Sequence, residues 1–410
     1  MNTNPKTESS FWQYWSPTFS GFLLYTTSIG LFGIYGVFVN IVAAEFNSSV
    51  AALGVGMALT SLVIGGTGPI IGPLLDRYPI KKIMLIGVTV TLVSFVVLAS
   101  GSSLLALALA LCFVTLGIAL YGQMPTNVML VNNYSSHRGR ALAVAASGTS
   151  FGGIVLPPLA AILISSFGWR QGLVVLAAAC SVIAFYAILI GLKHYKKLES
   201  ETPITSKAVN ETENAVQIPS PFRSKAFWLI GICFGLSYGA GTVYSFALVP
   251  HAQNLGYDIK AAALILSVGG AFGFIGKIAY AIYADRLKGK LVVTTLCLLT
   301  IQLLVWLIII HTDNLFMLYL SAAGLGLCAG AFLPLYPVFI STYFEESIMG
   351  KVSGNQALIF IPFLFMSAPL AGVSFDQTGS YVPMFWAVTG VTLVTMSLFA
   401  ILGQPTKRSH

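Results

Sequence analysis

One basic residue, Lys277, stands alone in a long apolar stretch of the sequence. It lies in FGFIGKIAYAIYADR, residues 272–286, with no aspartate or glutamate within seven positions on either side. An ammonium at membrane depth costs about 2.5–3.5 kcal/mol on insertion scales and needs an anionic partner or a wet cavity. This charge therefore predicts electrostatic binding of an anion. A structural interpretation stays open, because Asp285 is only about 12 Å further along a helix and the lysine stem can carry its ammonium toward the membrane surface.

Uncharged polar side chains on other apolar stretches are candidates for the same site. Gln123 and Asn127 are one helical turn apart and share a face. Hydroxyl groups are offered by Tyr35, Tyr238, Tyr244 and Tyr336. Each of these groups can hydrogen-bond a carboxylate or a substrate hydroxyl. Each is equally expected as a contact between helices.

The sequence lacks the patterns of an enzyme. It has no nucleotide-binding loop, no paired carboxylates at catalytic spacing and no His/Cys cluster at metal-ligand spacing. Its five cysteines all fall in apolar runs and are expected to be small buried hydrophobes. We therefore expect no enzymatic activity, no cofactor and no metal.

The elements that position these residues are predicted to be membrane-spanning helices. Of the 410 residues, 56% are hydrophobic and 8% are charged, whereas a soluble domain carries about 25% charged residues. Apolar runs of about 20 residues, each long enough to cross a bilayer as a helix, recur along the chain. We expect an all-α integral membrane protein with twelve spans, at 18–44, 50–76, 82–101, 104–132, 141–166, 171–192, 226–250, 261–284, 291–311, 315–342, 352–375 and 382–402.

The basic residues are distributed unevenly about these spans. Eighteen of the 21 lysines and arginines fall on the side of the two termini, and only Arg170 and Lys260 fall on the other side. Positive charge accumulates on the cytoplasmic side, so we expect a multi-pass protein of the cell membrane with both termini in the cytoplasm. The net charge of +8 is then a topology signal, and no nucleic acid is expected as a partner.

A polar segment divides the predicted spans six and six. Residues 193–225 are rich in Thr, Glu, Lys and Pro, a composition typical of a flexible linker. We therefore expect an N-terminal six-helix bundle at 1–192, a cytoplasmic linker at 193–225 and a C-terminal six-helix bundle at 226–410.

The two predicted bundles echo each other in sequence. GPLLDRYPIKK at 72–82 and AIYADRLKGK at 281–290 share an Asp-Arg pair, and RGRALAVAASG at 138–148 parallels MGKVSGNQALI at 349–359. GPLLDRYPIKK resembles the loop motif of the major facilitator superfamily, although Pro79 replaces its usual second glycine. The resemblance implies two pseudo-symmetric bundles around a central cavity and a gating role for the Asp-Arg pairs, while the alternative is that these charges only mark the membrane edge. The implied gate residues are Asp76, Arg77, Asp285 and Arg286.

Two further stretches narrow the resemblance to one branch. GIYGVFVNIVAAEFNSS at 33–49 and SSHRGRALAVAASGTSFGGIVLPPLAAILISSFGWRQG at 135–172 resemble the organic-anion branch, with the monocarboxylate transporters and oxalate:formate antiporters. Helix 8 of that family carries an aspartate and, four residues later, an arginine that binds the substrate carboxylate. These positions fall on Gly273 and Lys277. Lys277 keeps the positive charge of the family's arginine but lacks its planar guanidinium, which can bind a carboxylate through two hydrogen bonds. Gly273 and Gly276 are expected to leave room beside Lys277.

The resemblance implies a secondary active transporter that moves a small, monocarboxylate-like organic anion by alternating access. We expect a monomer in the lipid bilayer that uses a proton as coupling ion in symport. Gly273 in place of the family's acid keeps an alternative open, an anion exchanger of the oxalate/formate kind. From another class, an efflux pump for an anionic or neutral amphiphile, such as a siderophore or drug, also fits.

Overall fold

The computed structural model describes residues 5–134, 138–193, 222, 224–283, 290–345 and 348–403, and these residues form helices and no strands. The helices of the N-terminal half, residues 5–193, are α1 (Pro5–Gly33), α2 (Tyr35–Glu45), α3 (Val50–Arg77), α4 (Ile80–Ser100), α5 (Leu104–Tyr121), α6 (Gln123–Asn133) and α7 (Arg138–Gly191). Those of the C-terminal half, residues 224–403, are α9 (Lys225–Asn254), α10 (Ile259–Tyr283), α11 (Leu291–Ile310), α12 (Leu315–Tyr343), α13 (Met349–Thr378) and α14 (Val382–Leu402). Most of the predicted linker lies outside the described residues.

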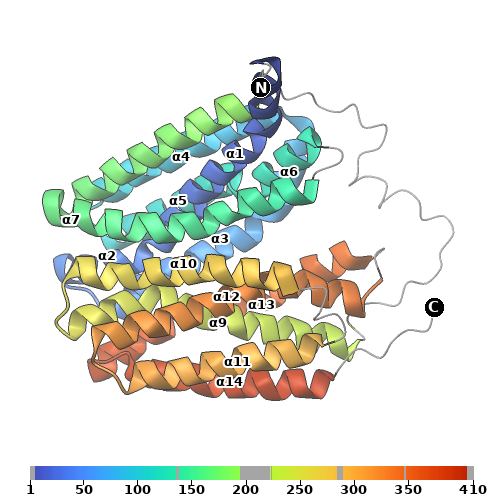
Figure 1. Ribbon diagram of the computed structural model, residues 1–410. Coiled ribbons are helices and arrows are strands. Elements are labelled where there is room, and N and C mark those ends of the chain that lie inside the picture. Colours follow the sequence, from blue (N-terminus) through green and yellow to red (C-terminus); the bar gives the residue numbers. More distant parts are fainter. Residues whose placement is uncertain are drawn as a thin grey trace.

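The described helices are long and apolar enough for twelve membrane crossings. Eleven segments are long and apolar enough to cross a bilayer, and one of them, 139–191, has 53 residues. A straight helix of that length would measure about 80 Å, far more than the roughly 30 Å of hydrocarbon. Instead, α7 turns back at Gly168, whose φ of 76° suits glycine, and two separate arms leave this turn (Figure 1). The predicted all-α membrane fold is confirmed.

Two of the predicted spans are each built from two helices. The span expected at 18–44 divides at Ile34 between α1 and α2, and α1 begins earlier than expected, at Pro5. The span expected at 104–132 divides at Gly122, whose φ of −74° and ψ of −131° are not helical. Pro125 follows in the first turn of α6, where its missing N–H costs no hydrogen bond. The break therefore separates Gln123 and Asn127 from the helix that precedes them.

The two halves pack against each other through several pairs of helices. We call the end where α1 begins and α14 ends the terminal end, and the opposite end the distal end (Figure 1). Helix α7 packs on α10, α3 on α13 and α2 on α9. At the distal end, Asn40 Nδ2 donates to Gln253 Oε1 at 3.0 Å, and the carboxylate of Asp376 accepts the N–H groups of Val50 and Ala51 at 2.8 and 2.9 Å.

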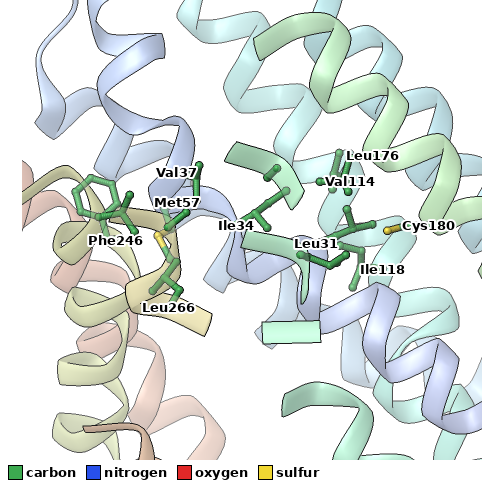
Figure 2. Close-up of a cluster of buried hydrophobic side chains, with 14 of the residues drawn as sticks. Leu31, Ile34, Val37, Met57, Val114, Ile118, Leu176, Cys180, Phe246 and Leu266 are labelled. Atoms are coloured by element: carbon green, nitrogen blue, oxygen red, sulfur yellow. The ribbon is translucent and has the colours of Figure 1, made fainter. Parts of the chain in front are cut away.

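The buried apolar side chains form two clusters, which differ between the distal and the terminal end. One cluster runs through both halves, and Figure 2 shows Val37, Met57, Phe246 and Leu266 of four different helices within it. A second cluster belongs wholly to the C-terminal half. It includes residues at the terminal ends of five helices, namely Phe227, Leu291, Phe339, Val352 and Phe399. Among the described residues, the halves thus share an apolar core distally, while the C-terminal half keeps a separate core at the terminal end.

Candidate functional site

Lys277 lies on α10 with its ammonium against the other half of the molecule. Its Nζ donates to Thr149 Oγ1 at 2.6 Å and to Ser150 Oγ at 2.8 Å. Both hydroxyls belong to α7, and the lysine side chain is half-buried. The lone charge of the apolar stretch is therefore part of a polar contact that joins the two halves.

Glycines bring α7 and α10 close enough for this contact. A Cβ on Gly270 would lie 2.9 Å from the carbonyl carbon of Gly153, so the two backbones touch there. Gly153 is one helical turn beyond Ser150, and Gly270 is two turns before Lys277 on α10. Small residues permit close helix approach in lipid, where burial against another helix brings no hydrophobic gain. The lysine stem then reaches hydroxyls on the neighbouring helix.

The partners of Lys277 are uncharged. Thr149 Oγ1 donates its own proton to Ala146 O at 2.8 Å and so presents a lone pair to the ammonium. Ser150 is buried, with 6% of its surface exposed. The ion pair between Arg170 and Glu45 lies elsewhere, at the start of the second arm of α7 and the end of α2. Hydroxyl dipoles stabilise the ammonium, but no described carboxylate neutralises it.

The space expected beside Lys277 is filled at Gly276. Gly273 is buried against α12, where a Cβ would lie 3.4 Å from the carbonyl oxygen of Gly326, and a Cβ on Gly276 would lie 2.2 Å from Leu327 O. The expectation of room is therefore wrong at Gly276, whereas a Cβ on Gly273 would make an ordinary van der Waals contact. Both glycines serve the packing of α10 on α12, and the position of the family's helix-8 acid faces a neighbouring backbone.

The candidates in the N-terminal half have partners of their own. Asn127 Oδ1 accepts the hydroxyl proton of Tyr25 at 2.7 Å, which ties α6 to α1. Tyr35 donates its hydroxyl proton to Leu53 O at 2.6 Å, which ties α2 to α3. Gln123, by contrast, is exposed at the start of α6. Among the described residues, no hydrogen bond joins any of these three side chains to Lys277.

Two of the predicted tyrosines of the C-terminal half, Tyr238 and Tyr336, lie together in an aromatic group. The rings of Tyr238 and Tyr336 each meet the ring of Phe360 edge-on with centroids 5.4 Å apart. Phe234 contacts both tyrosines. Tyr244 lies apart from this group and donates its hydroxyl proton to Ile265 O at 3.3 Å. The structure therefore brings α9, α12 and α13 together around two of the predicted hydroxyls.

The four predicted gate residues are described only in part. Asp76 and Arg77 are the last two residues of α3, and Arg77 is exposed. Asp285 and Arg286 lie outside the described residues. The gating role of all four therefore stays a prediction.

Thr149 and Ser150 are site residues that inspection of the sequence missed. They occur in SGTSFGG, residues 147–153, within the small-residue run taken as a packing surface. Neighbouring residues on a helix point in different directions, so the spacing of Thr149 and Ser150 does not predict that both hydroxyls contact one ammonium. A signal was nevertheless present, since a buried lysine without a carboxylate needs acceptors and this run offers paired hydroxyls.

The N-terminal half also contains an apolar cavity of about 100 Å³. It is lined by side chains that include Leu31, Phe38, Met57, Leu111 and Trp169, together with Tyr35. Lys277 is not among the lining residues. Because its described walls carry no charged side chain, this cavity is not suited to an anion.

A charged cluster lies at the distal end of the same half. Arg170 donates to Glu45 Oε1 from Nη2 at 2.7 Å and to Gly101 O at 2.9 Å. The guanidinium also covers the ring of Trp169, with its central carbon 4.5 Å from the centroid, and Trp169 Nε1 donates to Glu45. These contacts tie α7 to α2 and to the turn after α4, and they explain the Trp-Arg pair as a structural element.

Comparisons with known proteins agree with this fold. A family model described as Major Facilitator Superfamily matches residues 21–359. Human monocarboxylate transporter 12 is 25% identical over 325 residues, which are 72% of this chain and 61% of that protein. Chicken (Gallus gallus) monocarboxylate transporter 4 is 25% identical over 392 residues, 90% of this chain and 80% of that protein. The crystal structure of a D-xylose-proton symporter superposes with a TM-score of 0.78 at 14% identity, covering 97% of this chain and 98% of that one, a likeness of fold alone.

Proposed function

Because the chain belongs to the major facilitator superfamily, a family of transporters rather than enzymes, we propose that it moves a small organic monoanion across the membrane by alternating access. The predicted superfamily and its monocarboxylate-like branch are confirmed by the match over residues 21–359 and by relatives named monocarboxylate transporters. The substrate we propose is a monocarboxylate, as the names of these relatives suggest.

The position of Lys277 is the observation that carries this proposal. Its ammonium is half-buried between α7 and α10 and has only hydroxyl partners among the described residues. Hydrogen bonds to neutral acceptors do not cancel a charge, and a buried charge without a counter-ion is costly. A monoanionic substrate supplies one opposite charge, which balances that cost when it binds.

Other parts of the proposal concern the moving bodies and the remaining contacts. Two six-helix bundles, 1–192 and 226–410, are proposed to rock about the central site, with 193–225 as their link. Asn127, Gln123, Tyr35, Tyr238 and Tyr336 are proposed to become substrate contacts during this motion. The distal contacts and the separate terminal core support a state that is closed distally and opens toward the terminal end.

The coupling ion and the orientation complete the proposal. We propose proton symport, with Lys277 and the substrate sharing the charge change, in the cell membrane with both termini in the cytoplasm. The distribution of basic residues supports this orientation. In this orientation the proposed state is open to the cytoplasm.

Uptake by the purified protein in proteoliposomes tests the proposal. Radiolabelled formate, L-lactate and pyruvate are offered with an imposed proton gradient, with and without a protonophore, and with and without unlabelled anion inside. We expect uptake that is abolished by the protonophore and needs no internal anion. Uptake that requires an internal anion and ignores the protonophore would identify an exchanger instead.

Lys277→Ala is the matching variant. It is expected to insert normally and to lose uptake, while Lys277→Arg keeps part of it because the positive charge remains. Lys260→Ala, which removes an exposed lysine at the distal end, serves as the control. Normal uptake by Lys277→Ala, or no uptake of any carboxylate by the wild type, would overturn the proposed function.

A further inference from the structure

The hydrogen bonds at Lys277 leave one hydrogen-bond donor unused in each half of the molecule, an N–H of Lys277 and the O–H of Ser150. A lysine ammonium carries three N–H donors, and two of them point to Thr149 and Ser150. Among the described residues, no third acceptor contacts Nζ. One N–H of Lys277 is therefore free for a ligand.

Ser150 differs from Thr149 in what its hydroxyl proton does. Thr149 donates its proton to Ala146 O within its own helix. Ser150 Oγ accepts from Lys277, and no described acceptor takes its own proton. Because the Ser150 side chain is buried, a free O–H donor there has no ready access to bulk water, and an unused buried donor is costly. The side chain is therefore prepared to donate to something that binds beside Lys277.

A carboxylate fits the two free donors. It has two acceptor oxygens, one for the third N–H of Lys277 and one for the O–H of Ser150. These donors come from α10 and α7, hence from the C-terminal and the N-terminal half. A single carboxylate then contacts both halves at once.

We propose that Ser150 is a substrate-binding residue that donates its O–H to the substrate carboxylate, and that Thr149 is a positioning residue that holds the Lys277 ammonium beside it. This inference rests on the proposed function and deepens it. The site binds one carboxylate, which contacts both halves. A neutral amide in its place does not neutralise the positive charge of Lys277. The remainder of the substrate makes no contact with Ser150, so loss of Ser150 weakens all carboxylates equally.

Binding to the purified full-length protein tests this pair of roles. Thermal stabilisation is titrated with formate, acetate, L-lactate and pyruvate, and with L-lactamide as the neutral analogue, each variant being referred to its own ligand-free melting temperature. The variants are Ser150→Ala, Ser150→Thr, Thr149→Val and Thr149→Ser. Ser147→Ala is the matched control, because Ser147 lies on the same helix and donates to its own backbone at Val144 O.

We expect Ser150→Ala to weaken binding of all four carboxylates by about the same factor, roughly fivefold to tenfold for one lost hydrogen bond. Ser150→Thr restores the hydroxyl and should bind within about twofold of the wild type. Thr149→Val keeps the shape and loses the acceptor, so it should weaken binding about threefold or more, and Thr149→Ser should recover it. Ser147→Ala should match the wild type, and L-lactamide should not bind.

The outcomes separate this inference from the proposed function. If Lys277→Ala loses binding while Ser150→Ala binds like Ser147→Ala, the role of Ser150 is wrong and the proposed function stands. If Ser150→Ala weakens one carboxylate and spares the others, Ser150 contacts another part of the substrate and the inference is overturned. If the wild type binds none of the four carboxylates, the proposed function itself fails.

Discussion

The carboxylate of Asp376 on α13 accepts the backbone N–H of Val50, the first residue of α3, at 2.8 Å, and thereby links the two halves at the distal end. Its other oxygen accepts the N–H of Ala51 at 2.9 Å. The first N–H groups of a helix have no partner within the helix, and a negative charge there is favourable. An acidic side chain of one half thus caps a helix of the other, and any opening toward the distal side must break this cap.

Asp376→Asn is expected to loosen the distal end. The amide still offers one oxygen but loses the charge, which is worth about 0.3–2 kcal/mol at a helix N-terminus. The measurement is labelling of Ser245→Cys by a membrane-impermeant maleimide in a cysteine-free background, since Ser245 O lies against Gly36 of the other half. We expect labelling to rise about twofold to tenfold. Asp258→Asn is the control, because Asp258 accepts from Lys260 N in its own half. Equal labelling in both variants would contradict the role of Asp376 in holding the distal end closed.

The approach of α7 and α10 predicts an asymmetry between two glycines. A Cβ on Gly270 would lie 2.9 and 3.0 Å from backbone atoms of Gly153 and Ile154, whereas a Cβ on Gly153 would lie 3.7 Å from Gly270. Gly270→Ala must push the helices apart, at a cost of about 1–3 kcal/mol, and should reduce uptake about fivefold or more. Gly153→Ala should transport nearly normally. Equal effects of the two variants in the proteoliposome assay would show that the helices do not touch at Gly270.

Restoring the family's acid should not restore its role. Gly273→Asp places a carboxylate against the backbone of α12, with its Cβ 3.4 Å from Gly326 O. Taking a carboxylate out of water costs several kcal/mol, and Lys277 one turn away is expected to offset this cost only in part. We expect a lower yield and a lower melting temperature in detergent, while Gly273→Ala stays near the wild type. A stable Gly273→Asp protein with stronger proton coupling would mean that this position faces the transport path.

Arg170 is expected to matter for stability rather than for transport. Its guanidinium bonds Glu45, Ala99 O and Gly101 O and covers the ring of Trp169. The side chains of the Arg170–Glu45 pair are about one-third exposed. Because solvent screens this ion pair, it contributes little to the free energy of unfolding, and the hydrogen bonds to the two carbonyl groups contribute more. Arg170→Ala should lower the free energy of unfolding by about 1–2 kcal/mol, seen as a lower melting temperature in detergent. Glu45→Gln should cost less, and a larger loss for Glu45→Gln would reverse this ranking.

The architecture follows from the amino-acid sequence alone. Long apolar runs, a low charge content and an asymmetric distribution of lysine and arginine predict twelve helical crossings, because lipid satisfies no backbone hydrogen bonds and helices satisfy their own. It also singled out Lys277, since a charge in hydrocarbon is costly enough to be informative wherever it occurs. The breaks at Ile34 and Gly122 were not predicted, because apolar composition does not report local φ and ψ.

The surroundings of Lys277 depend on the tertiary packing of the helices and could not be predicted. The glycines at 273 and 276 predicted free space from their position on the same helix as Lys277, but the backbone of α12 fills that space at Gly276. The partners of the ammonium are Thr149 and Ser150, more than 120 positions away in the chain. Contacts between residues so distant depend on how closely two helices approach, here through Gly153 and Gly270. That distance is set by packing of the whole bundle and is absent from any local pattern.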